Sequence, residues 1–345
     1  MTTRPSARLG GLWACDLLDV TSDVSVLDSS GRWAVSLPYD GPAVCARFAT
    51  WTHDRPHLQA SWRGPQPDSW RSSLDSRGYE ERVERIRESI AAGSVYQANL
   101  CRVMSAALPD ASRADVAALL ELLDAGNPAP YSGYLDLPSH GVAIATASPE
   151  LFLSVSSEQR GRVIRSGPIK GTGRHASDLS DKDAAENVMI VDLVRNDLSR
   201  ISQVGSVSVP GLLTVEEHPG LVHLVSHVES VLHDEVRWQQ IIDATFPPGS
   251  VTGAPKISAL ALIDELEPVP REYYCGALGW VDADTGEAEL AVTIRTFWKG
   301  DGQVFFGTGA GITWGSDPLA EWRETELKAA RLIDVAAGRW QADPP

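Results

Sequence analysis

The chain has 345 residues, of which 43% are hydrophobic, and 30 Lys and Arg against 46 Asp and Glu give it a formal net charge of −16. This composition is enough for a sizeable globular core in one large or two modest domains. The negative charge repels phosphates and anionic lipid headgroups at long range, so we expect no nucleic acid partner and no membrane partner.

The four cysteines, Cys15, Cys45, Cys101 and Cys275, show neither a CxxC pair nor a metal-type spacing. We expect them to be reduced and mostly buried. No apolar run reaches the roughly 20 residues of a membrane-spanning helix, and the first residues contain no apolar run of signal-peptide length. The sequence therefore predicts a cytoplasmic protein.

Residues 1–77 and 78–340 differ in pattern, and we predict two segments. The first is rich in Trp, Pro, Ser and Asp, which indicates short strands and loops. In the second, apolar residues recur at steps of three and four from Val83 to Ile90, which predicts an amphipathic helix at 79–93.

Strands and helices then alternate along the chain. Strand-like runs are expected at 95–108, 131–137, 141–148, 150–156, 162–167, 273–283, 287–298 and 303–309. Helices are expected at 116–126, 179–201, 236–246, 254–267 and 317–338. Strands on a hairpin rhythm with interleaved helices favour an α+β or mixed α/β fold, with helices outside the sheets, over a parallel doubly wound fold.

Two pairs of carboxylates recur at a three-residue spacing, Asp183 with Glu186 and Glu321 with Glu324. This spacing places each pair on one face of its predicted helix. For a single pair, a solvated face or compensation of the helix dipole is the simpler interpretation. Two such pairs on separate helices could instead converge on Mg²⁺, which prefers carboxylate and water oxygens.

Lys170 lies in the stretch GPIKGT, where a buried strand is expected to end. A salt bridge is one interpretation of such a lysine. The other is chemical, because an apolar pocket favours the neutral form of an amine, and a neutral amine is a nucleophile. Glu150, between Pro149 and Leu151, is a matching acid, since burial would raise its pKa and suit it to protonate a leaving group.

Two loops of small residues, GSVTGAPK from Gly249 and GTGAGI from Gly307, could present backbone N–H groups to an anion. Tight turns explain such loops equally well, and neither fits the P-loop or the dinucleotide fingerprint. Arg295, in an apolar strand-like run, needs a carboxylate from the protein or from a substrate. His223, also in an apolar run, favours a hydrogen-bonded core histidine.

Ten motifs between Tyr79 and Ile333 resemble those of the chorismate-utilising enzymes, in the family's order and approximate spacing. They are SVYQANL, SPELF, GPIKGT, AENVMIVDLVRNDLSRI, VHLVS, PPGSVTGAPK, IDELEP, YYCGALG, TIRT and TGAGI. Within this family the chain most resembles component I of aminodeoxychorismate synthase, because a lysine at position 170 is the mark of that group. Its N-terminal segment is expected to be shorter than in many members.

The resemblance implies a core of two antiparallel β-sheets sandwiched between outer helical layers. It implies Mg²⁺ held by Glu186 and Glu324, with Asp183 and Glu321 in supporting roles. The residues that it places around chorismate are Gln97, Ser250, Thr252, Gly253, Tyr274, Arg295, Gly309, Ala310 and Gly311. Gln97 stands where members that add water have a lysine base.

The reaction implied is attack of Lys170 on carbon 2 of chorismate while Glu150 protonates the leaving hydroxyl at carbon 4, followed by entry of ammonia at carbon 4. Thr172 is expected near the reacting centre, and His223 matches a histidine linked in anthranilate synthases to pyruvate elimination. The product, 4-amino-4-deoxychorismate, would serve p-aminobenzoate and folate synthesis or an aminobenzoate-derived metabolite.

Since no cysteine lies in the Gly-x-Cys-x-Gly turn of a glutaminase, we expect the ammonia to come from a glutamine amidotransferase subunit in a heterodimer. Two alternatives stay open. One is anthranilate synthase component I, whose members usually have a small residue at position 170. The other is a non-catalytic protein that binds chorismate as a regulator.

Overall fold

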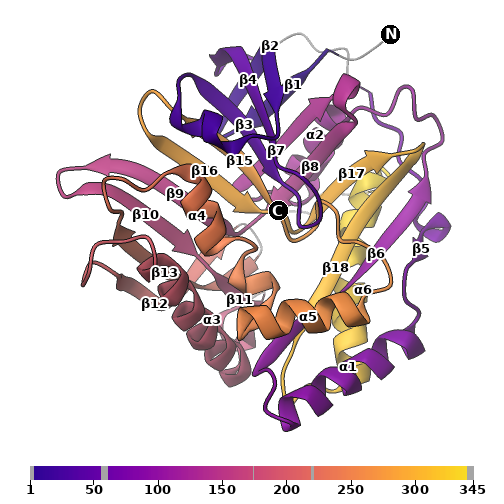
Figure 1. The fold of residues 1–345 in the computed structure, drawn as a ribbon. Coiled ribbons are helices and arrows are strands. Elements are labelled where there is room, and N and C mark those ends of the chain that lie inside the picture. The colour runs from indigo at the N-terminus through magenta and orange to yellow at the C-terminus, as the bar shows by residue number, and fades with distance from the viewer. Residues whose placement is uncertain (1–3, 56–60, 174, 219–220, 340–345) are drawn as a thin grey trace.

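The computed structural model describes residues 4–55, 61–173, 175–218 and 221–339 (Figure 1). Its α-helices are α1 (Ser76–Ala91), α2 (Val116–Gly126), α3 (Asp181–Ser199), α4 (Trp238–Thr245), α5 (Lys256–Leu266) and α6 (Pro318–Ala336), and a short 3-10 turn, η5, spans Gly249–Val251.

The strands are β1 (Ser6–Leu9), β2 (Leu12–Thr21), β3 (Arg32–Leu37), β4 (Val44–Thr52), β5 (Arg71–Ser72), β6 (Gln97–Ala107), β7 (Tyr131–Leu137), β8 (Val142–Ser148), β9 (Leu151–Glu158), β10 (Gly161–Gly167), β11 (Ile169–Gly173), β12 (Ser208–His218), β13 (Leu221–Val231), β14 (Gly253–Ala254), β15 (Ala277–Asp282), β16 (Glu287–Val292), β17 (Thr296–Gly300) and β18 (Gln303–Ile312).

These strands form one antiparallel hydrogen-bonded set. Its order is β12, β13, β10, β9, β16, β15, β3, β4, β2, β1, β7, β8, β17, β18 and β6, with β11 also on β13 and with β5 and β14 on β6.

The predicted α+β fold is confirmed. The two expected sheets are the two halves of this set, and strands of the N-terminal segment join them, because β3 pairs with β15 and β1 pairs with β7. The division at residues 77 and 78 stays a prediction.

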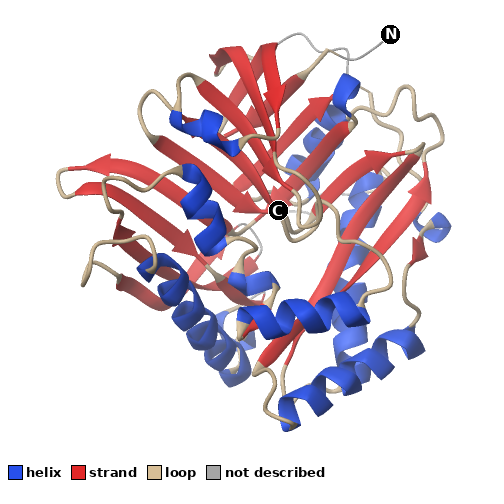
Figure 2. Cartoon of the chain, viewed as in Figure 1, coloured by secondary structure: helices blue, strands red, loops and turns tan. Residues whose placement is uncertain are grey.

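Helices lie against the strands of both halves (Figure 2). Helix α3 packs against β11, β12 and β13 in one half, and α2 packs against β7 and β8 in the other. Helix α6 packs against β18 and also contacts α1 and α2. None of the helices described here is both long and apolar enough to span a bilayer.

Helix α1 shows why the predicted helices form where they do. Asp75 accepts a hydrogen bond from the Gly78 N–H at 2.7 Å and so satisfies a donor that the first turn leaves free. The apolar stripe buries Tyr79 and Val83 against β6, where the Tyr79 hydroxyl donates to the Leu100 carbonyl at 3.0 Å. The pattern of three- and four-residue steps is therefore confirmed as a core-facing helix.

Two strand predictions were partly wrong, one in its middle and one at its start, and the backbone explains both. The run 287–298 is two strands, because Arg295 takes a φ of 52° and a strand cannot continue through that conformation. The run 273–283 becomes a strand only at Ala277, because Cys275 takes a φ of 65°. Strands β12 and β13 were not predicted as elements.

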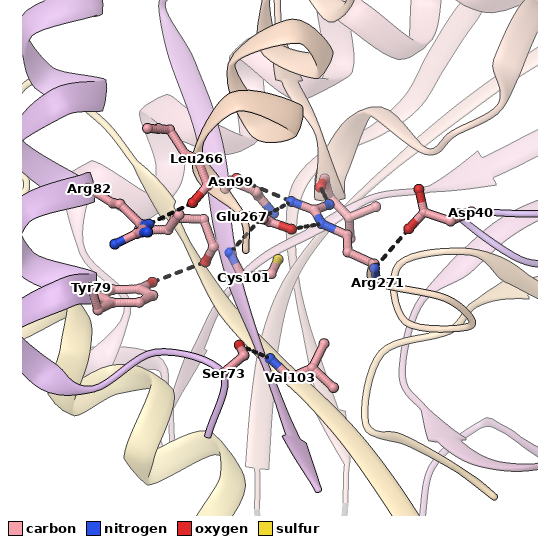
Figure 3. Close-up of polar contacts among 12 residues, drawn as sticks. Asp40, Ser73, Tyr79, Arg82, Asn99, Cys101, Val103, Leu266, Glu267 and Arg271 are labelled. Carbon is pink, nitrogen blue, oxygen red and sulfur yellow. Dashed lines mark hydrogen bonds and ion pairs between the residues drawn. The ribbon is translucent and has the colours of Figure 1, made fainter. Parts of the chain in front are cut away.

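A buried ion pair joins the end of α5 to β6 and to η5 (Figure 3). Arg271 and Glu267, whose side chains are 1% and 6% exposed, form two hydrogen bonds of 2.7 and 2.8 Å. The guanidinium also donates to the Val251 carbonyl at 2.8 Å and to the Asn99 carbonyl at 3.2 Å. Glu267 accepts the Cys101 N–H at 2.8 Å. The pair is thus fully hydrogen-bonded, which is the condition under which a buried charge pair is tolerated.

Candidate active site

The turn at Ser250 brings the predicted nucleophile and the predicted acid together. The Lys170 amine, on β11, donates to the Ser250 carbonyl at 3.0 Å. The Ser250 hydroxyl bonds to the carboxyl of Glu150, which lies between β8 and β9. Lys170, on β11, and Glu150, in the connection between β8 and β9, therefore approach the same residue from two different segments of the chain.

Glu150 is only 3% exposed. Burial raises its pKa to about 7, although the Ser250 hydroxyl, the Lys170 charge and the Ile169 N–H each act to lower it. The Arg295 guanidinium acts in the same direction more weakly. A carboxyl of this kind exchanges its proton near neutral pH, which is the property that a general acid needs.

Arg295 lies in the break between β16 and β17, where its positive φ turns it out of the strand direction. Burial lowers the pKa of Arg295 to about 10, while the charge of Glu150 opposes that shift. The arginine is still a cation at neutral pH. It therefore places a positive charge beside Glu150 that can face a substrate carboxylate.

On the other side of the site, carboxylates of α3 and α6 share one ammonium group. Lys182 lies 2.9 Å from a Glu321 oxygen and 3.6 Å from a Glu186 oxygen. Burial raises the pKa of Glu186, against the lowering effect of the Lys170 and Lys182 charges. Glu321 is 3% exposed, and its second oxygen, Oε2, has no hydrogen-bond donor among the described residues.

Glu324 and Asp183 are engaged by other partners. Glu324 pairs with Lys328 at 2.6 Å, and the same ammonium donates to the Gly309 carbonyl at 3.1 Å. Burial acts to raise the pKa of Glu324, but Lys328 and other nearby lysines lower it overall. Asp183 caps α3 by accepting the N–H and the hydroxyl of Ser180 at 2.9 and 2.7 Å.

Among the residues that the structure describes, no three carboxylate, imidazole or thiol side chains lie close enough to share a metal ion. The pair that comes together is Glu186 with Glu321. Its donor chemistry still fits a divalent cation, because a lysine ammonium already lies between the two carboxylates and one buried carboxylate oxygen has no donor. The predicted roles in metal binding stay predictions.

Two glycines allow neighbouring segments to approach β6 closely. A Cβ at Gly253 would lie 2.2 Å from the Gln97 carbonyl, so only glycine permits β14 to pair with β6. A Cβ at Gly311 would lie 2.4 Å from the Gln97 amide nitrogen and 3.3 Å from both Asn99 Oδ1 and Glu186 Oε2. Gly311 therefore forms one wall of the site.

The remaining predicted residues lie close by but differ in what they contact. The Tyr274 ring covers Gly307, where a Cβ would lie 2.0 Å from the ring. The Thr252 hydroxyl donates to the Pro248 carbonyl at 3.1 Å and so holds the η5 turn. The Ala310 side chain belongs to the core beneath α1.

His223 is buried on β13 and pairs through its backbone with Thr172 of β11. For Thr172 only the backbone is described. The pairing holds the stretch that carries Lys170 against β13, so a role of either side chain in chemistry stays a prediction.

Two residues of the site were missed from the sequence. Asn99 donates its amide N–H to the Ser250 carbonyl at 3.3 Å, and Lys182 bridges α3 to α6. Asn99 lies two positions after Gln97 on one strand, and side chains two positions apart point to the same face of a strand. The sequence could therefore have indicated that Asn99 lies beside Gln97. For Lys182 the signal is weak, because the partner lies 139 positions away in the sequence.

A family model described as chorismate binding enzyme matches residues 28–334. The chain belongs to this family. Aminodeoxychorismate synthase component 1 of Escherichia coli is 36% identical over 296 residues, which cover 81% of this chain and 63% of that protein. Anthranilate synthase component 1 of Streptomyces coelicolor is 40% identical over 300 residues, which cover 84% of this chain and 57% of that protein. The chain thus spans about three fifths of the length of these relatives.

Solved structures of the family share the fold. A 2,3-dihydroxybenzoate-specific isochorismate synthase from Bacillus anthracis superimposes with a TM-score of 0.79 at 22% identity, over 98% of this chain and 96% of that one. Anthranilate synthase component I from Streptococcus pneumoniae gives a TM-score of 0.75 at 24% identity, over 96% and 91%. The chorismate-utilising fold predicted from the motifs is confirmed.

The raised pKa of Glu150 predicts a pH dependence of stability. The folded protein holds this proton up to about pH 7 and the unfolded chain releases it near 4.5, so stability falls as pH rises through that window. Glu150→Gln has no carboxyl to titrate at this position. The free energy of unfolding of the variant minus that of the wild type should therefore rise by about 3 kcal/mol between about pH 4 and a pH above 7. Urea unfolding of both proteins at the two pH values measures this, and an equal pH dependence would show that Glu150 titrates normally.

Proposed function

We propose that the chain is aminodeoxychorismate synthase component I, which converts chorismate and ammonia to 4-amino-4-deoxychorismate. The observation that carries the proposal is the convergence of the Lys170 amine and the buried Glu150 carboxyl on Ser250. A nucleophile and a proton donor held at one residue can act together on two positions of one small ring.

In the first step the Lys170 nitrogen forms a bond to carbon 2, the ring double bond shifts, and the bond from carbon 4 to its hydroxyl breaks. Glu150 donates its proton to that hydroxyl, which leaves as water. In the second step ammonia forms a bond to carbon 4, the double bond shifts back, and lysine leaves carbon 2 as a neutral amine. The new ammonium passes a proton to Glu150, which restores the acid.

Chorismate carries two carboxylates, and an acidic protein must supply cations to bind them. Arg295 would face one carboxylate beside Glu150. Bound Mg²⁺ would supply the positive charge for the other. Glu186 and Glu324 would hold the ion, with Asp183 and Glu321 in support, and the proximity of Glu186 to Glu321 supports this assignment.

Ammonia would come from a glutamine amidotransferase subunit that associates with this chain as a heterodimer in the cytoplasm. The proposal is supported by the absence of a glutaminase Cys turn from the sequence. The product would feed p-aminobenzoate and folate synthesis or an aminobenzoate-derived metabolite.

Anthranilate synthase component I is the second candidate, and its support is the 40% identity to the Streptomyces coelicolor protein of that name. In that reaction ammonia itself would attack carbon 2, and pyruvate would leave. The Lys170 amine disfavours this candidate, because it lies beside the acid that would activate the ring and so competes with ammonia for carbon 2.

The test is an assay of the purified chain with chorismate, Mg²⁺ and ammonium, followed by addition of an aminodeoxychorismate lyase. We expect p-aminobenzoate only after the lyase is added. Lys170→Ala should abolish this product, since carbon 2 then has no nucleophile. Anthranilate formed without the lyase would support the second candidate, and binding of chorismate without turnover would support a regulator.

The position of Lys182 predicts how the metal binds. If its ammonium competes with Mg²⁺ for Glu186 and Glu321, Lys182→Met should bind Mg²⁺ about tenfold more tightly, which corresponds to about 1.4 kcal/mol. Lys182→Arg keeps the charge and should resemble the wild type. Calorimetric titration with Mg²⁺ alone measures the affinity without turnover. Equal affinity in all three proteins would show that Glu186 and Glu321 do not bind the metal.

A further inference from the structure

Lys170 lies in an irregularity of the pairing between β11 and β13. The pairing is regular at Ile169 and again at Thr172. Between these positions β11 has two residues, Lys170 and Gly171, whereas β13 has only one, Leu224. Two residues opposite one form a β-bulge, which bends its strand and changes the direction of the side chains within it. The bulge therefore decides where the Lys170 amine points.

Gly171 gives the bulge its backbone conformation and its place against α3. Its φ is 82°, which residues with a side chain rarely adopt. A Cβ at this position would lie 2.9 Å from the Cβ of Asp183, in the first turn of α3. The backbone beside Lys170 thus lies directly against the helix that carries the predicted metal ligands.

Asn187, on α3, binds the backbone on both sides of the bulge. Its Nδ2 donates to the Leu224 carbonyl, opposite the bulge, at 3.1 Å and to the Pro168 carbonyl, two residues before Lys170, at 3.5 Å. Its Oδ1 accepts the hydroxyl of Ser226. Two carbonyls accept hydrogen bonds only, so the NH₂ group must face them. One side chain therefore connects β11, β13 and α3.

Ser226, on β13, extends this contact to the next strand. Its hydroxyl accepts the N–H of Leu213, on β12, at 2.9 Å, and its own N–H donates to the Pro168 carbonyl at 3.1 Å. Both Asn187 and Ser226 are 0% exposed. Each side chain has partners for its donor and its acceptor, and a satisfied buried network of this kind fixes one arrangement of the segments around it.

The alternative to the bulge is a regular pairing of β11 with β13. Successive side chains point to opposite faces of a strand, so a slip by one residue would turn Lys170 to the other face, away from Ser250. Such a slip would also move the Pro168 carbonyl past the Leu224 carbonyl. The Asn187 amide could then no longer bind both, so its hydrogen bonds favour the bulged pairing.

We propose that Asn187 is a positioning residue for the nucleophile, because its amide selects the bulged pairing of β11 in which Lys170 points at the substrate ring. The inference rests on the proposed function. It adds to that function a physical link between the strand that carries the nucleophile and the helix that carries Glu186.

The experiment is kinetics of the full chain with chorismate and ammonium. Asn187→Leu keeps a similar volume but has neither the donors nor the acceptor. It should lower kcat about 100-fold, since displacement of a reacting atom by about 1 Å costs a factor of this size. The KM for chorismate should stay within about twofold, because other residues bind the substrate. The rate at which the Lys170 adduct forms without ammonia should fall by the same factor as kcat.

Ser226→Ala and Ser230→Ala are the matched pair. Both serines are fully buried on β13, and each hydroxyl bonds to one other side chain, Ser226 to Asn187 and Ser230 to Ser202. Ser230 pairs with Ile164 of β10, away from the bulge. Urea unfolding should show a similar loss of stability in both variants, whereas kcat should fall, about tenfold, only in Ser226→Ala. This pair carries the test if Asn187→Leu does not fold.

Each outcome decides a separate point. A folded Asn187→Leu with kcat within about twofold of the wild type would overturn the positioning role. An equal loss of kcat in Ser226→Ala and Ser230→Ala would do so too, because the effect would then be one of general stability. A higher Mg²⁺ requirement with an unchanged rate of adduct formation would show that Asn187 positions Glu186 instead. If the wild type forms no aminated product, the proposed function fails, and the positioning role fails with it.

Discussion

The candidate active site depends on the carbonyl and hydroxyl of one residue, Ser250. Its carbonyl accepts the Lys170 amine and the Asn99 amide, and its hydroxyl bonds to Glu150. A shift of this turn would therefore move the proposed nucleophile, the proposed acid and the amide relative to one another. The proposed chemistry therefore depends on the position of this turn.

The turn is held by the most deeply buried charge pair of the described residues. Arg271 binds the carbonyl of Val251, next to Ser250, while Glu267 fixes the guanidinium and the β6 backbone (Figure 3). An arginine suits this position because its planar guanidinium presents several donors in fixed directions. The pair is thus connected to the η5 turn and to β6 through three hydrogen bonds, at Val251, Asn99 and Cys101, rather than through apolar contacts alone.

The site separates its charges into two regions. Arg295 lies beside Glu150, a carboxyl that is largely protonated below pH 7, so this region carries a positive charge. The facing ends of α3 and α6 carry the carboxylates Glu186 and Glu321, between which Lys182 lies. A substrate with two carboxylates would need a cation in both regions, and in the proposed function Mg²⁺ would supply the one between α3 and α6.

The sequence was sufficient for the elements whose pattern is local. Helix α2 spans the predicted residues 116–126, because its apolar spacing and the Asp115 cap are both visible in the chain. The break at Arg295 was not predictable, since a positive φ at arginine has no local signature. Lys170 and Glu150 stood out by residue type, and the family motifs placed them in one site.

What the sequence could not show are contacts between distant segments. The bridge from Lys182 to Glu321 and the shared use of the Ser250 carbonyl depend on how three elements pack, and no spacing rule encodes that.

The central claim is that the Lys170 nitrogen bonds to the substrate ring. Intact-mass spectrometry of the chain quenched during turnover with chorismate and without ammonia tests this most directly. The account predicts an adduct with the mass of chorismate less one water, and peptide mapping that places it on Lys170. Full amination by Lys170→Met, with no adduct on the wild type, would contradict it.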